Sequence, residues 1–214
     1  MLSLNLPLNS ACLKLIYQNI YPYFCCKMYS TLKYLLLFVF IFSSYCSFAQ
    51  DGLLPTDGGK NVLYTDSGKP DKSKEQLYKT AQGWITQTFG NYENAVTFQD
   101  PQTGKLIISS YVPVLHSTFD HIRFNLTIVC QENSYQASIN MLDGIAQIRS
   151  PKRIGQAEND MVIEKSMAVK TETNRKKKAE AELALQKQQA DNEQINTAMY
   201  KLLAGLKTFM IEAK

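Results

Sequence analysis

Alternation of apolar and polar residues predicts a meander of β-strands in the middle of this chain. The alternation is strictest over residues 119–131, where the apolar positions share one parity: Ile122, Phe124, Leu126, Ile128 and Cys130. Further strands are expected at 94–99, 105–112 and 135–142, the last with Tyr135, Ala137, Ile139 and Met141 facing inward. Because the turns between them are short, neighbouring strands are expected to be antiparallel, with one buried and one solvated sheet face.

A helix is predicted before the meander and another after it. Ser73-Lys74-Glu75-Gln76 has the form of a capping box, and apolar residues at helical spacing follow up to Phe89, with Gly90 as a left-handed cap. A second apolar stripe predicts an amphipathic helix over 191–214. Residues 151–190 are charged and lack a firm stripe, so they are expected to form a linker or a helix.

The order of these elements predicts the fold class. A strand at 61–65, a helix, four strands and a C-terminal helix indicate a two-layer α+β domain over residues 50–150. Its expected core is an antiparallel curved sheet, and the C-terminal helix extends the domain. The side chains expected to anchor this core are Trp84, Phe89, Phe124, Ile128 and Cys130.

An apolar run at 34–42 predicts a signal peptide over 28–49, cleaved between Ala49 and Gln50. The run is less than half of the ~20 apolar residues that a membrane-spanning helix needs, and no comparable run follows it. Residues 1–27 are interpreted as an extension from a start codon assigned too early. Lipidation at Cys46 is not expected, because the bulky Tyr45 precedes it. The sequence therefore predicts export to the periplasm or cell envelope.

Removal of that leader changes the cysteine count and the net charge of the chain. Of five cysteines only Cys130 stays in the mature chain, so no intramolecular disulfide is expected there. The leader also takes three lysines and no acids, which lowers the net charge from +4 to +1. A nucleic-acid partner is therefore not expected. The basic run Arg175–Lys178 is flanked by glutamates and is interpreted as a solvated helix face.

Several of these motifs together resemble a known family of proteins. The residues that carry the resemblance are the helix start Ser73–Tyr78, Trp84, Phe89, the turn Asp100–Lys105, Phe124 and Ile128. Over about residues 61–148 the chain resembles uncharacterised exported proteins of Bacteroidota, a domain of unknown function with a fold like that of the TATA-binding protein. The resemblance implies a fold and a compartment, but it implies no catalytic residue and nothing about DNA.

One histidine–carboxylate cluster is the candidate for metal chemistry. His116, Asp120 and His121 offer nitrogen and oxygen ligands that suit Zn²⁺. Asp120 and His121 are adjacent at the start of a strand, however, so their side chains are expected on opposite faces. The cluster is therefore a weak candidate. The sequence contains no common hydrolase, phosphate-loop or paired-cysteine motif, and no cofactor is expected.

The favoured function is a non-enzymatic binding or interaction domain of the cell envelope. Its expected partner is another protein or a small apolar ligand, held between the layers or on the open sheet face. Self-association through residues 157–214 is a further hypothesis, because a poorly striped helix would project from a small domain. The alternative is a metal-dependent envelope hydrolase centred on His116 and His121.

Overall fold

The computed structural model describes residues 51–115 and 117–212. All of these residues belong to one compact unit, residues 50–214. The expected signal peptide, its cleavage site at Ala49 and Gln50, Cys46 and His116 all lie outside the described residues.

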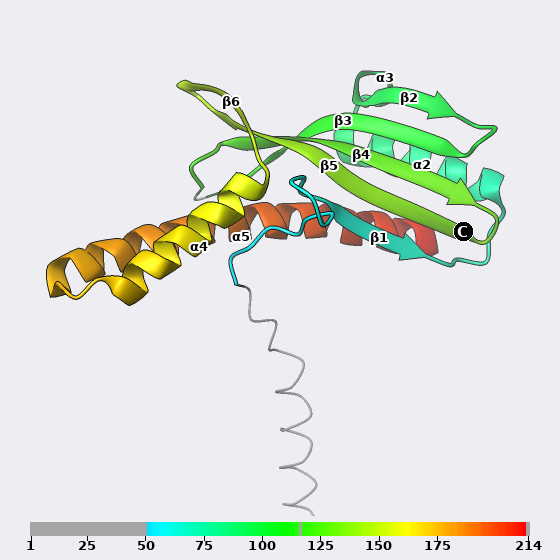
Figure 1. Cartoon of the computed structure of the whole chain (residues 1–214). Coiled ribbons are helices and arrows are strands. Elements are labelled where there is room, and N and C mark those ends of the chain that lie inside the picture. The colour runs from blue at the N-terminus through cyan, green and yellow to red at the C-terminus, as the bar shows by residue number, and fades with distance from the viewer. Residues whose placement is uncertain (1–50, 116, 213–214) are drawn as a thin grey trace, which may run out of the picture. The chain divides into compact units, whose positions relative to one another are not determined.

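The described residues form one curved antiparallel sheet of six strands. In chain order these are β1 (Tyr64–Gly68), β2 (Val96–Asp100), β3 (Lys105–Pro113), β4 (His121–Gln131), β5 (Ser134–Ala146) and β6 (Arg149–Arg153). The spatial order is β1-β5-β4-β3-β2, and β6 pairs with the end of β5 (Figure 1). The expected α+β fold class with an antiparallel meander is confirmed.

Helices cover one face of this sheet. The described helices are α2 (Lys74–Phe89), the single turn α3 (Tyr92–Ala95), α4 (Gln156–Thr171) and α5 (Arg175–Glu212). α2 packs on β4 and β5, and the second half of α5 runs beside β1 and against α2 (Figure 1). The capping box is confirmed, since the Gln76 N–H donates to Ser73 Oγ over 3.3 Å and the Ser73 N–H donates to Gln76 Oε1 over 2.9 Å.

The core lies between the sheet and these two helices. On β4, each of the five residues of the apolar parity is buried, while the residues between them are half-buried on the other face. Trp84, Phe124, Ile128 and Cys130 are buried, and Phe89 is partly buried against the same cluster. The core thus draws on the middle strands and on the inner faces of α2 and α5.

The expected inward position of Met141 is wrong. The register between β4 and β5 shifts between Arg123 and Asn125, which places one extra residue on β5. Met141 lies in this bulge. Its backbone is in the left-handed conformation (φ 53°) and its side chain is 56% exposed, whereas Leu142 is buried. A β-bulge of this kind reverses the parity of everything after it.

Of the two alternatives expected for residues 151–190, a charged linker or a helix, the structure shows mostly helix. Residues 149–153 form β6, although Pro151 stands in the strand, because β6 lies at the edge of the sheet, where a missing amide is tolerated. α4 and α5 then form a helical hairpin, in which Lys165 Nζ donates to Gln188 Oε1 over 3.1 Å. Residues 173–180 at its tip are exposed, including the basic run. The C-terminal helix begins at Arg175 and not near residue 191.

A short N-terminal segment, residues 52–54, is held against α4 and α5 by buried asparagine side chains; we call it the strap. The Leu54 N–H donates to Asn159 Oδ1 (2.7 Å) and Asn159 Nδ2 donates back to the Leu54 carbonyl (2.9 Å). Asn192 Nδ2 donates to the Gly52 carbonyl (2.7 Å), and Asn196 Nδ2 donates to the Leu53 carbonyl (3.0 Å). Gly52 is required there, because its φ is +65° and a Cβ would lie 2.6 Å from Gln189 Cγ.

Removing one strap contact should destabilise the fold. Asn192→Ala leaves the buried Gly52 carbonyl without its donor, so the free energy of unfolding should fall by about 1–3 kcal/mol. Urea denaturation of the 50–214 chain measures this. Gln186→Ala, which removes an exposed amide from the same helix, is the control and should change the midpoint little. Equal effects of the two substitutions on the free energy of unfolding would show that the Asn192–Gly52 hydrogen bond does not stabilise the fold.

Burial of Cys130 makes stability depend on alkaline pH. Desolvation raises the pKa of its thiol from 9.0 to about 11. The unfolded chain therefore loses this proton first, and stability falls as the pH rises above 9, by at most about 1.4 kcal/mol per pH unit up to the folded-state pKa. Between pH 9 and 10, the free energy of unfolding should fall less steeply in Cys130→Ala than in the unsubstituted 50–214 chain. If the free energy of unfolding fell equally steeply with pH in both proteins, the thiol could not be buried and neutral in the folded state.

Candidate functional site

A groove runs between α2 and α5 on the helical side of the sheet; we call it the α2–α5 groove. It consists of two depressions with volumes of about 510 Å³ and about 820 Å³. Both are lined by Trp84, Thr88, Lys201 and Gly205. The first also reaches the end of β3 and the loop after it, and the second extends toward the end of α5. A volume of this size is typical of small-molecule sites, which occupy roughly 300–1,000 Å³.

The first depression is mainly apolar. Its apolar lining comes from Trp84, Val112, Pro113, Val114, Leu115, Ala198 and Leu202. The loop that carries Val114 and Leu115 is fastened to α5, because the Thr118 N–H donates to Asp191 Oδ1 over 2.8 Å. Leu115 is nonetheless 70% exposed at the edge of the depression. The groove therefore has a fixed wall and an uncovered leucine at its rim.

Trp84 forms the floor that the two depressions share. Its ring packs edge-on against Phe89, with ring centroids 5.6 Å apart, and Phe89 in turn packs against Phe124. Only 4% of the Trp84 surface is exposed. The apolar spacing of α2 thus fixes the ring in the core, while one edge of it borders the groove.

The exposed edge of Trp84 carries its polar atom. A Cβ placed on Gly205 would lie 3.9 Å from Trp84 Nε1. Apart from atoms of the neighbouring helix backbone, no other heavy atom would lie within 4 Å of it. Within the described part of the chain, the indole N–H has no hydrogen-bond partner. It is not among the fully buried polar atoms without a partner, so it is accessible at the surface of the groove. A side chain at residue 205 would lie against this donor, so Gly205 keeps it uncovered.

The charges of the groove are unevenly placed. Lys201 is the one charged residue among those lining the first depression, and it also lines the second. No ion pair involves it within the described residues. Glu212 lines only the second depression. The shared floor thus combines a cation with an indole donor.

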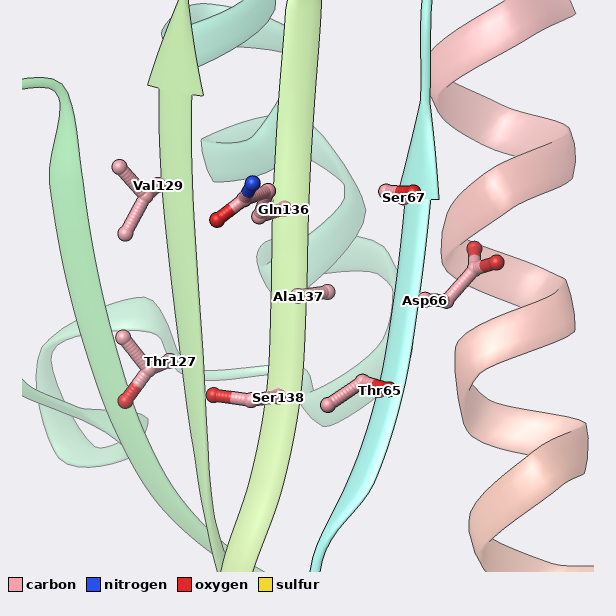
Figure 2. A pocket seen from close by; sticks show the side chains of 8 residues that line it. All are labelled: Thr65, Asp66, Ser67, Thr127, Val129, Gln136, Ala137 and Ser138. Carbon is pink, nitrogen blue, oxygen red and sulfur yellow. The ribbon is translucent and has the colours of Figure 1, made fainter.

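A separate depression lies on the open face of the sheet, opposite the helices (Figure 2). It is lined by the small or polar side chains of Thr65, Ser67, Thr127, Val129, Gln136 and Ser138, with Asp66 and Ala137 at its border. In Figure 2, Asp66 points away from this face toward α5, where it accepts from Lys207 Nζ over 3.0 Å. The depression offers hydrogen bonds but no deep apolar wall, and the carboxylate of its one charged residue points away from it, so the α2–α5 groove is the better candidate.

The same open face carries a charged cluster that joins three strands. Asp143 on β5 is 5% exposed and binds both Arg123 on β4 and Arg153 on β6. Its hydrogen bond and charge raise the pKa of the Arg123 guanidinium. Because the carboxylate is already shared by two guanidinium groups, the cluster explains how β6 is held to the sheet.

The weak candidate cluster of His116, Asp120 and His121 lies only partly within the described residues. His121 is exposed at the start of β4, and Asp120 Oδ2 accepts a hydrogen bond from the Gln147 N–H over 2.9 Å. Among the described residues no group of three or more histidine, cysteine or acidic side chains is placed to hold a metal.

Sequence reasoning identified Trp84 but missed its neighbours Lys201 and Gly205. One signal was available, because Gly205 interrupts the strong apolar stripe of α5 at a site where alanine would favour the helix by about 1 kcal/mol. An unexplained glycine inside a helix often marks close packing or a site.

The comparisons with known proteins concern the sheet region. Residues 65–143 match the family described as a domain of unknown function (DUF4468) with TBP-like fold. The resemblance stated from the sequence is therefore confirmed, and the match supports the fold class. No curated protein matches this chain.

Two solved structures are similar to the chain. A DUF4468 family protein from Bacteroides ovatus has a TM-score of 0.40 and 14% identity, over 48% of this chain and 64% of that one. The chain thus spans 64% of the length of that protein. A TBP-like protein from Parabacteroides distasonis has a TM-score of 0.45 and 16% identity, over 72% of this chain and 96% of that one.

None of the helices within 51–115 and 117–212 has the length and apolar character required to span a bilayer.

Proposed function

We propose that this protein is an exported, non-enzymatic binding module of the cell envelope, and that it binds an apolar group in the α2–α5 groove. The observation that carries this proposal is the apolar depression over the indole edge of Trp84, with an open space beside Gly205. The bound group is either a small molecule or an apolar side chain of a partner protein.

The choice of binding over catalysis rests on the chemistry of the lining. The first depression offers apolar walls, hydroxyl and amide groups and Lys201, but its lining includes no histidine, cysteine or carboxylate. Histidine, cysteine and carboxylate side chains are the most common catalytic acids, bases and nucleophiles. The apolar walls favour affinity for an apolar group instead.

The sequence supplies an internal reporter for this site, because Trp84 is its only tryptophan. N-Phenyl-1-naphthylamine, a neutral apolar dye, should bind the 50–214 chain and accept excitation energy from Trp84. Gly205→Leu should reduce this transfer at least tenfold by filling the space beside the indole. Ala184→Leu adds the same side chain to an exposed site of α5 and should leave the transfer unchanged.

Two results would contradict the groove. One is dye binding without energy transfer from Trp84. The other is an equal loss in Gly205→Leu and Ala184→Leu. Circular dichroism of each variant checks that the helices remain formed, so that a lost signal is not simply a lost fold.

Export is tested by the N-terminus of the processed protein. Expressed from Met28 in a Bacteroidota host, the protein recovered from the envelope should begin at Gln50, because Ser47 and Ala49 provide the small residues that signal peptidase requires. Ala49→Phe should retain the leader. Cys46→Ser should be processed normally, whereas loss of processing in that variant would indicate a lipid-modified protein.

A further inference from the structure

We infer that the α2–α5 groove takes an amphiphile with one carboxylate head group, such as a fatty acid. This inference rests on the proposed binding function and specifies its ligand. The acyl chain would lie in the first depression, and the carboxylate would lie over the shared floor between Lys201 and the Trp84 indole N–H.

The walls of the first depression suit an unbranched chain. Val112, Val114 and Leu202 provide apolar surface, and Leu115 stands 70% exposed at the rim. Burying one methylene group strengthens binding roughly fourfold, so a chain that covers these side chains gains affinity with length. Covering the exposed Leu115 side chain strengthens ligand binding in the same way.

The floor selects the head group. Trp84 Nε1 is a donor without a partner within the described residues, on a side chain that is 4% exposed. Lys201 adds a positive charge that no acidic side chain of the described residues neutralises. Both residues line the two depressions, so a carboxylate bound there would have both donors at hand. Charge-assisted hydrogen bonds to such a group are stronger than neutral ones.

Charge also excludes the opposite head group. Glu212 is the acidic residue of the lining, and it belongs only to the second depression. A ligand whose chain occupies the first depression places its head beside Lys201. An alkylammonium there would meet a like charge and leave the indole N–H unpaired.

The test compares three ligands with the same chain: dodecanoate, methyl dodecanoate and dodecylamine. Each is titrated below its micelle concentration into the 50–214 chain carrying the naphthylamine dye. Dodecanoate should displace the dye at least tenfold more tightly than dodecylamine. The ester should fall between them, because it keeps an acceptor but lacks the charge.

Two residue-level readouts follow the head group. The single indole ¹H–¹⁵N NMR signal should shift with dodecanoate and less with dodecylamine. Lys201→Met should weaken dodecanoate binding at least tenfold more than it weakens binding of the uncharged dye. Lys187→Met removes an exposed lysine of the same helix outside the groove and should have no effect.

The two proposals fail differently. Equal affinity for dodecanoate and dodecylamine, or an unchanged affinity in Lys201→Met, overturns the carboxylate head group while dye binding still supports the groove. No dye transfer from Trp84 in the unsubstituted chain overturns both.

Discussion

The buried amide contacts of the strap are the constraint on which the rest of the structure depends. Asn159, on α4, and Asn192 and Asn196, on α5, bind the strap backbone through their side-chain amides. Asn196 also accepts from the Tyr64 hydroxyl of β1 over 2.8 Å. These bonds set the position of α5 against the edge of the sheet. Since α5 forms one wall of the groove and fastens the loop after β3 at Asp191, the geometry of the site follows from them.

The elements that could be predicted are those determined by neighbouring residues. The capping box at Ser73 and the alternation in β4 depend on contacts within a few residues, and both are present in the structure. Met141 was misplaced because its parity depends on a bulge, which arises from pairing with another strand. β6 was missed for the same kind of reason, since Arg153 joins the sheet through Asp143 on β5.

The candidate site was only partly visible in the sequence. Trp84 was identified from the stripe of α2, and that position explains its burial. Its role as the floor of the groove depends on Gly205, which lies more than a hundred residues later in the chain. The two residues come close only after α5 has packed against α2. Local patterns could not show that the helix–helix contact leaves a donor facing an open space. A tryptophan in an apolar stripe can therefore be both a core residue and the floor of a binding site.

The strap has a consequence for the order of assembly. Leu54 and Asn159 are separated by 105 positions in the chain, Gly52 and Asn192 by 140, and Leu53 and Asn196 by 143. The segment that leaves the ribosome first among the described residues therefore docks only after its partners on α4 and α5 exist. Contacts of such long range close slowly. Until α5 is complete, the amides and carbonyls of the strap stay in water, and the sheet edge at β1 is uncovered. The first described segment of the chain is therefore among the last to reach its final place, because its hydrogen-bond partners lie near the other end of the described chain.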